Sequence, residues 1–206
     1  MLTTENILFL LLAYLIGAFP SAVWLGHTFY NTDVREYGSG NAGATNTFRI
    51  LGMKAGIPVL LMDILKGWIA VNLIYFVPDV KVYDLKFAFG IAAVIGHLFP
   101  IYTGFRGGKG IATMLGFMIG IYWQAALLSA LVFILTLLIS KYVSLSSIIA
   151  SFAFPFIVVI ILGMNNTNNS LIIFSIFVPI LSLITHQKNI ERLIRREENK
   201  AKFGKK

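Results

Sequence analysis

Residues 111–140 read IATMLGFMIGIYWQAALLSALVFILTLLIS and contain no charged side chain. As one straight helix this stretch would extend about 45 Å at about 1.5 Å per residue, whereas the hydrocarbon core of a bilayer is about 30 Å thick. Tyr122, Trp123 and Gln124 stand near its middle, and aromatic rings favour the membrane–water interface. We therefore expect two short helices with a turn at this point.

Five other stretches of the chain are almost free of Lys, Arg, Asp and Glu. They are residues 6–30, 55–77, 87–105, 143–163 and 171–185. The whole chain of 206 residues is 57% hydrophobic and 13% charged, with a mean hydropathy of +0.80. Most of the stretches are long enough for one helical crossing, which needs about 20 apolar residues. The pattern excludes a soluble globular domain, a secreted disulfide scaffold and a disordered chain. It predicts an all-α polytopic membrane protein.

The positive charges of the short loops distinguish two ways of counting the spans. Seven spans with the N-terminus outside place 14 of the 17 Lys and Arg residues inside and two outside, with Lys66 in the membrane. Six spans with the N-terminus inside place 11 inside and five outside. Since Lys and Arg of short loops favour the cytoplasmic side, we predict seven transmembrane helices and a cytoplasmic C-terminus. The short span after residue 111 is allowed to be partly re-entrant.

Residues 1–206 are interpreted as a single integral membrane domain with a basic cytoplasmic tail over residues 186–206.

The charge and the residue types exclude several kinds of ligand. The net charge of +8 is explained by the cytoplasmic bias, so no nucleic-acid partner is predicted. Cysteine is absent and the three histidines lack metal-ligand spacing, so we expect neither a metal nor a cofactor. Three loops and the tail share the predicted cytoplasmic face, where we expect the chemistry.

The first of these loops contains GSGNAGATNTFR, residues 38–49. Its glycines match the dinucleotide pattern G-x-G-x-x-G, but that pattern needs a βαβ unit and here it follows a membrane helix. Glycines let successive backbone N–H groups converge on an anion, and an arginine can grip a phosphate with two hydrogen bonds. We therefore favour a phosphate site over a turn without a ligand. Its candidate residues are Gly38, Ser39, Gly40, Asn41, Thr45, Asn46 and Arg49.

The second loop lies within GHLFPIYTGFRGGKGIAT, residues 96–113. It is not a Walker A loop, because Thr103 stands where that motif needs glycine. Three glycines flank Lys109 at the start of a helix, where free N–H groups and the helix dipole attract anions. A positively charged turn at the membrane edge would explain the cations but not the glycines. We predict a phosphate site on a lipid-like substrate, made by Gly107, Gly108, Lys109 and Gly110.

Two further segments complete the predicted face. KYVSLSSI, residues 141–148, opens a helix with Ser144 and Ser147, although serines at a helix start are often caps. HQKNIERLIRREENK, residues 186–200, places His186 and Asn189 three apart on one helical face. The alternative for this segment is a basic end that touches anionic lipid, and we favour it only for the lysines after residue 199.

Two further features fall inside the apolar stretches. Asp63 and Lys66 are three apart and should pair on one helical face, so we interpret them as structural rather than catalytic. His97 precedes Phe99 and Pro100 and is interpreted as a satisfied histidine at a helix end.

Together the four segments resemble the acyl-phosphate:glycerol-3-phosphate acyltransferase family, the PlsY type of bacterial membrane enzyme. The resemblance covers essentially the whole chain. It rests on GSGNAGATN followed by Arg49, on GH-x-x-P with FRGGKG-x-AT, on YVSL-x-SI and on H-x-x-N-x-x-RL. The family's last motif ends RL-x-x-G-x-E, and here Arg196 stands in place of that glycine while Glu198 matches. We therefore expect the local turn of the tail to differ and assign no specific role to Glu198.

The resemblance implies a seven-helix enzyme of the bacterial cell (inner) membrane with a cytoplasmic active site. It implies transfer of an acyl group from acyl phosphate to the 1-position of glycerol 3-phosphate. The products would be lysophosphatidic acid and inorganic phosphate, in the first step of bacterial phospholipid synthesis and without a cofactor. The partners would be these substrates and membrane lipids; an enzyme that produces acyl phosphate would be a further partner, which the sequence does not show. The functional positions carried onto this chain are Ser39, Thr45, Arg49, Lys109 with its glycines, Ser147, His186 and Asn189.

Acyl phosphate is already activated, so the predicted mechanism needs no protein nucleophile. It needs two anions to be positioned and developing charge to be stabilised. The side chains predicted to hold the phosphate of glycerol 3-phosphate are Arg49, Lys109, His186 and Asn189. The amides of Gly107–Gly110, with Ser39 or Ser147, would cradle the head of acyl phosphate. The general base is either His186 or a substrate phosphate, whose second pKa is about 6.

Two other functions are compared with this one. An acyl-CoA-dependent acyltransferase uses H-x4-D, and Glu191, five positions after His186, only approaches that pattern. A transporter of a phosphorylated anion usually has internal repeats and polar breaks at mid-membrane, and we find neither in the sequence.

Overall fold

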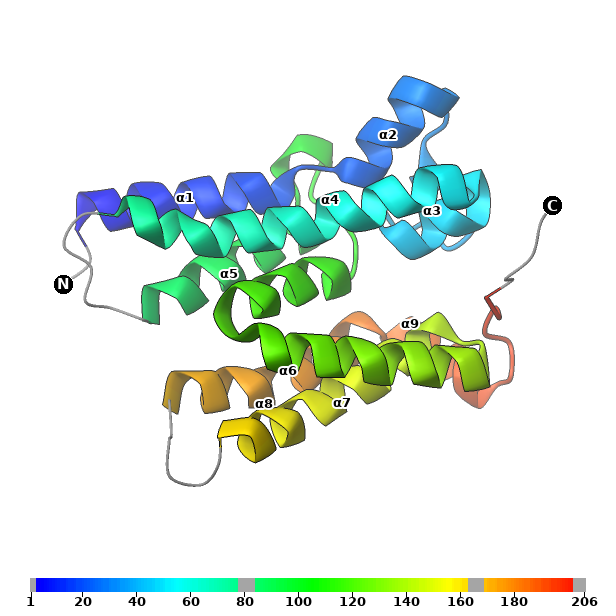
Figure 1. Ribbon diagram of the computed structural model, residues 1–206. Helices are drawn as coiled ribbons and strands as arrows, with labels where there is room; N and C mark the ends of the chain where they lie inside the picture. The colour runs from blue at the N-terminus through cyan, green and yellow to red at the C-terminus, as the bar shows by residue number, and fades with distance from the viewer. Residues whose placement is uncertain (1–2, 78–83, 163–168, 202–206) are drawn as a thin grey trace. The chain divides into compact units, whose positions relative to one another are not determined.

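Helices form throughout the apolar stretches of the chain (Figure 1). The computed structural model describes residues 3–77, 84–162 and 169–201, and within these ranges it contains helices and no strand. The all-α prediction is confirmed. The chain divides into two compact units, Met1–Ile121 and Tyr122–Lys206, which we call unit 1 and unit 2.

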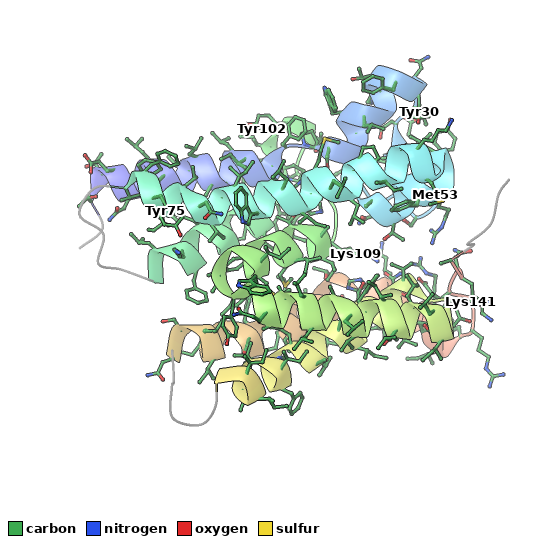
Figure 2. The ribbon with its side chains drawn as sticks, in the orientation of Figure 1. Tyr30, Met53, Tyr75, Tyr102, Lys109 and Lys141 are labelled. Carbon is green, nitrogen blue, oxygen red and sulfur yellow. The ribbon has the colours of Figure 1, made fainter. Side chains whose placement is uncertain are left out.

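Unit 1 contains the first five helices and the beginning of the sixth. The helices are α1 (Thr4–Ala18), α2 (Ser21–Tyr30), α3 (Ala44–Leu51), α4 (Met53–Asn72), α5 (Asp84–Leu98) and α6 (Ile111–Ser140). Short 3-10 turns follow α2, α4 and α5, at Val34–Glu36, Leu73–Phe76 and Ile101–Thr103. In Figure 2, Tyr30 and Met53 lie toward one end of this unit and Tyr75 lies toward the other, so α4 runs the length of the unit.

Unit 2 contains the rest of α6 and three further helices, α7 (Val143–Leu162), α8 (Asn169–Thr185) and α9 (Gln187–Ile194). Helices α7 and α8 pack together, and Phe154 meets Phe174 edge to face with the ring centroids 6.2 Å apart. Lys141 forms the corner between α6 and α7 with a left-handed φ of 63°.

Helix α6 is broken at Tyr122, where φ is −150° and ψ is 79°. The turn predicted near the middle of this stretch is thereby confirmed. The same residue begins unit 2. The piece before it, residues 111–121, is about 16 Å long at about 1.5 Å per residue, roughly half the thickness of the hydrocarbon core.

Within the described residues, four helical segments are long and apolar enough to cross a membrane: Met53–Phe76, Leu85–Thr103, Ile111–Ser140 and Val143–Ile161. Two bent pairs raise the number to as many as six, with α1 and α2 at 43° and α8 and α9 at 66°. Seven spans would require α6 to cross on both sides of its break. That number and the orientation stay predictions, and Lys81, one of the two external cations, lies outside the described residues.

Glycines allow the helices of unit 1 to approach closely, and α1, α4 and α5 pack against one another (Figure 1). Gly17 of α1 meets the backbone of Ala93 in α5, and Gly67 of α4 meets the backbone of Thr113 in α6. Because lipid tails are as apolar as leucine, membrane helices associate through such close packing rather than through hydrophobic burial.

Candidate active site

The first glycine-rich loop connects α2 to α3 in unit 1. Val34 anchors it, since this side chain is fully buried against α2 and α4. Gly38 and Gly40 have φ of 63° and 71°, a left-handed conformation that L side chains rarely adopt. A Cβ at Gly38 would also collide with the amide oxygen of Asn46. The two glycines are therefore required by the shape of the loop.

The side-chain amide of Asn46 stabilises this loop through three hydrogen bonds. Its Nδ2 donates to the carbonyl oxygens of Val34 (2.7 Å) and Tyr37 (3.1 Å), and its Oδ1 accepts from the backbone N–H of Ser39 (3.0 Å). Both amide hydrogens are thus used within the loop, and the residue is only 1% exposed. The sequence placed Asn46 among the substrate ligands; in the structure it positions Ser39.

Three of the predicted ligands, Ser39, Thr45 and Arg49, are exposed on the loop and α3, while Asn41 is half-buried. Within the described part of the chain, the guanidinium of Arg49 makes no hydrogen bond and no ion pair. An exposed guanidinium without a protein partner is suited to a bidentate bond with a phosphate.

The second glycine-rich loop leads from α5 into α6. The N–H of Gly108 donates to the carbonyl of His97 (3.1 Å), and a Cβ at Gly108 would collide with the His97 ring. Gly107 packs equally closely against the end of α5, and Gly110 has a φ of 80°. Close contacts at Gly107 and Gly108 and the backbone conformation at Gly110 therefore favour glycine at these positions, for reasons that the sequence did not reveal. Lys109 is half-buried among them (Figure 2).

The two loops of unit 1 are joined. The backbone N–H of Ala42 donates to the carbonyl of Gly107 (3.4 Å), and Nη1 of Arg35 donates to the carbonyl of Thr103 (3.0 Å). The structure thus brings together the first two predicted segments, which lie far apart in sequence.

A buried polar cluster lies beneath this junction. Nζ of Lys66 is 2.8 Å from Oδ1 of Asp63 and donates to the carbonyl of Phe19 at 2.9 Å. The hydroxyl of Ser21 donates to the same carboxylate. The predicted pairing of Asp63 with Lys66 is confirmed. Nδ1 of His97 lies 3.5 Å from Oδ1 of Asp63 and makes no hydrogen bond within the described residues.

Two of the predicted polar residues of unit 2, Ser144 and Asn189, bond to Glu198, a residue to which the sequence assigned no role. Its Oε1 accepts from the hydroxyl of Ser144 (2.9 Å) and from Nδ2 of Asn189 (2.8 Å), and its Oε2 accepts from Nε of Arg192 (2.8 Å). Burial acts to raise the pKa of Glu198, but these hydrogen bonds, that from Arg192 above all, outweigh it and lower the pKa. The carboxylate therefore joins the tail to α7 and α9.

His186 and Ser147 are buried near this cluster. Nδ1 of His186 lies 2.9 Å from the carbonyl of Ser182, and since a carbonyl only accepts, Nδ1 carries the hydrogen. In the neutral ring Nε2 is then the basic nitrogen. The hydroxyl of Ser147 donates to the carbonyl of Val143 (2.9 Å).

The turn after α9 keeps the shape that a glycine would favour. Arg196 has a φ of 60°, its N–H donates to Leu193 (3.2 Å) and the N–H of Glu197 donates to Arg192 (2.8 Å). These two bonds form a Schellman motif, in which the left-handed position is usually glycine. The expectation of a different turn is therefore wrong: the arginine adopts the left-handed conformation.

The end of the described tail is docked on unit 2. Nζ of Lys200 lies 5.5 Å from the centroid of the Tyr142 ring, and the N–H of Ala201 donates to the carbonyl of Lys141 (2.7 Å). Lys200 is exposed, and its predicted contact with lipid stays a prediction. Lys202, Lys205 and Lys206 lie outside the described residues.

Residues 7–196 match the model of a protein family described as glycerol-3-phosphate acyltransferase. This chain belongs to the glycerol-3-phosphate acyltransferase family. Proteins of that name from Listeria welshimeri and Enterococcus faecalis are 43% and 42% identical to it. The alignments cover 98% and 96% of this chain and 100% and 93% of the relatives.

Solved structures of the family agree with this fold. A crystal structure of PlsY (YgiH), an integral membrane glycerol 3-phosphate acyltransferase, in its glycerol 3-phosphate form superposes with a TM-score of 0.81 at 33% identity. It covers 97% of this chain and 96% of that one. A second structure, in the lysophosphatidic acid form, matches at 32% identity with the same TM-score, and covers 95% of this chain and 94% of the other. The chain is an integral membrane acyltransferase of the PlsY type, and the family resemblance is confirmed.

Proposed function

We propose that this glycerol-3-phosphate acyltransferase uses acyl phosphate as its donor and produces lysophosphatidic acid and inorganic phosphate. The junction of the two loops in unit 1 carries this proposal, because two hydrogen bonds join the loop of Ser39, which leads into the helix of Arg49, to the glycine-rich loop of Lys109. Such a surface suits phosphorylated substrates. The lysophosphatidic acid form of the related PlsY structure supports the product.

The reaction is an acyl transfer between two oxygen atoms. The hydroxyl oxygen on carbon 1 of glycerol 3-phosphate attacks the acyl carbon, the bond from that carbon to the phosphate oxygen breaks, and phosphate leaves. The hydroxyl proton passes to Nε2 of His186 or to a substrate phosphate. Because phosphate is a good leaving group, the enzyme needs to position two anions and stabilise charge.

The residues contribute in two ways. Arg49 and Lys109 bind phosphate, and Ser39 with the amides of Gly107 and Gly110 binds the acyl-phosphate head. The predicted part of the Gly108 amide is dropped, because this N–H donates to the carbonyl of His97. Asn46 positions Ser39, and Glu198 orders Ser144, Asn189 and Arg192. We infer that residues 1–206 act as a single acyltransferase domain, which the family match across residues 7–196 supports.

The donor is tested with purified protein, glycerol 3-phosphate and either acyl phosphate or acyl-CoA. We expect lysophosphatidic acid from acyl phosphate alone, and at least a 100-fold lower rate in Lys109→Ala, since removing one group that stabilises transition-state charge costs about 100- to 1000-fold. Lys188→Ala is the matched control, because Lys188 is exposed on α9. Product from acyl-CoA alone would refute the proposed donor. Uptake of glycerol 3-phosphate into vesicles without any product would favour a transporter.

The cytoplasmic location is tested by cysteine labelling, which is straightforward because the chain has no native cysteine. A thiol is placed at three exposed positions by Ser39→Cys, Arg106→Cys and Lys141→Cys. A fourth variant, Phe76→Cys, labels the exposed end of the 3-10 turn that follows α4. We expect an impermeant reagent to reach the first three from the cytoplasmic side and Phe76→Cys from the opposite side. Labelling of Ser39→Cys and Lys141→Cys from opposite sides would refute one cytoplasmic active site.

A further inference from the structure

Arg35 lies in the first loop and is held by Asp33 in a fork. Nη2 is 2.7 Å from Oδ2 of Asp33, and Nε donates to both carboxylate oxygens, at 3.0 Å and 3.1 Å. The same carboxylate accepts from the backbone N–H of Arg35 (2.9 Å). The Asp33 side chain is only 13% exposed and also lies 3.6 Å from Nε2 of the exposed His27.

The remaining side of the guanidinium reaches the second loop. Nη1 donates to the carbonyl of Thr103 (3.0 Å), which is 68 residues away in sequence and ends the 3-10 turn before the glycines around Lys109. The other bond between the loops, from Ala42 to Gly107, is longer at 3.4 Å. The guanidinium of Arg35 thus donates to a carboxylate of the first loop and to a carbonyl of the second. These bonds indicate that Arg35 orders the loops.

We propose that Arg35, oriented by Asp33, is a positioning residue that sets the spacing between the loop of Ser39 and the loop of Lys109. This inference rests on the proposed function, because the spacing matters only if both loops bind the reacting substrates. The planar guanidinium can bond a carboxylate and a carbonyl in fixed directions at once, whereas a lysine ammonium is a point charge on a flexible stem. A conservative replacement by lysine therefore keeps the charge and loses the spacing.

The pair holds its charge at neutral pH. The hydrogen bond from the Arg35 side chain lowers the pKa of Asp33 to about 2, against the opposing effect of burial. The same bond raises the pKa of Arg35. The constraint on the loops is therefore present throughout the physiological range.

The kinetic test uses Arg35→Lys and Asp33→Asn. A misplacement of about 1 Å costs about 100-fold in rate, so we expect Arg35→Lys to lower kcat/KM for glycerol 3-phosphate by about 10- to 100-fold, and Asp33→Asn to lower it in the same direction. The matched controls are Arg195→Lys and Glu191→Gln. That pair has the same 2.7 Å separation but is more than half exposed on α9, and we expect changes below about 2-fold.

A distance measurement distinguishes positioning from direct binding. Spin labels at Glu36→Cys and Arg106→Cys, both exposed, report the separation of the two loops. We expect a narrow distribution in the parent chain, a broadened or shifted one in Arg35→Lys, and no change in Arg195→Lys. A lower rate with an unchanged distribution would overturn the proposal, because Arg35 would then act on substrate itself. A shifted distribution with an unchanged rate would overturn it as well. Failure of the parent chain to use acyl phosphate would refute the proposed function instead, and the distances would still show whether Arg35 spaces the loops.

Discussion

The two units hold their polar residues in opposite ways. In unit 1 the backbone and buried groups such as Asn46 shape the loops, and Ser39, Thr45 and Arg49 remain exposed on them. In unit 2 the polar residues Ser144 and Asn189 are buried and are bonded to one carboxylate. The first arrangement presents side chains to a ligand; the second fixes them before any ligand arrives. Substitutions should therefore affect mainly activity in unit 1 and mainly stability in unit 2.

The largest effect on stability is expected at Glu198. Glu198→Ala would remove the carboxylate to which the buried Ser144 and Asn189 donate, at a cost of about 1–3 kcal/mol for each buried group left unsatisfied. It would also remove the counter-ion of the half-buried Arg192. Thermal unfolding in detergent would measure the loss. Glu197→Ala, at an exposed neighbour, is the control and should change the unfolding free energy by less than about 0.5 kcal/mol. Equal effects of the two changes would contradict the ordering role of Glu198.

A smaller cost in stability, with a larger one in activity, is expected at Gly108. In Gly108→Ala the new methyl group would push against the His97 ring, and such overpacking costs about 1–3 kcal/mol. We also expect about a 100-fold lower rate, because Lys109 moves with its neighbour. Gly104→Ala is the comparison, since no atom lies within 4 Å of its Cβ and only the φ of 65° opposes it. A rate for Gly108→Ala close to that of Gly104→Ala would refute this account of the loop.

The Asp33–Arg35 pair predicts a response to acid. The pKa of Asp33 is lowered from 3.8 to about 2 in the folded chain, so its contribution to stability is complete above pH 4. That contribution is lost as the pH falls from about 4 through about 2. Unfolding measured across this window should show a smaller pH dependence in Asp33→Asn than in the parent chain. Identical slopes for the two proteins would contradict the lowered pKa.

The smallest effects are expected in the turn after α9. Replacing either of two neighbouring arginines by glycine should change the free energy of unfolding, with opposite signs. Arg196→Gly relieves a left-handed residue and should stabilise unit 2 by about 1 kcal/mol. Arg195→Gly places glycine at a residue in right-handed helical conformation and should destabilise it by about 0.5–1 kcal/mol. Chemical denaturation of both variants measures the difference, and the same sign for both would show that the left-handed angle carries no strain.

Sequence patterns predicted the helices and the two glycine-rich loops that the structure joins, but not the contacts that individual residues make. The break at Tyr122 followed from length and aromatic position, and the pairing of Asp63 with Lys66 followed from helical spacing. Glu198 was given no role because its bond to Ser144 spans 54 residues, and its bonds to Asn189 and Arg192 depend on how the tail folds back on α9. Arg35 was counted only as a loop charge, since its bond to Thr103 depends on how the two loops fold together.

The amino-acid sequence by itself determined that this chain is a helical membrane protein, and it predicted phosphate-binding motifs, because apolar length and glycine-rich cationic segments are local properties. Tertiary structure alone decided which glycines serve close packing, which asparagine supports a loop and which carboxylate gathers the residues of unit 2. The physical reason is that a hydrogen bond or a steric limit depends on distances between groups remote in the chain, and only the folded backbone sets those distances.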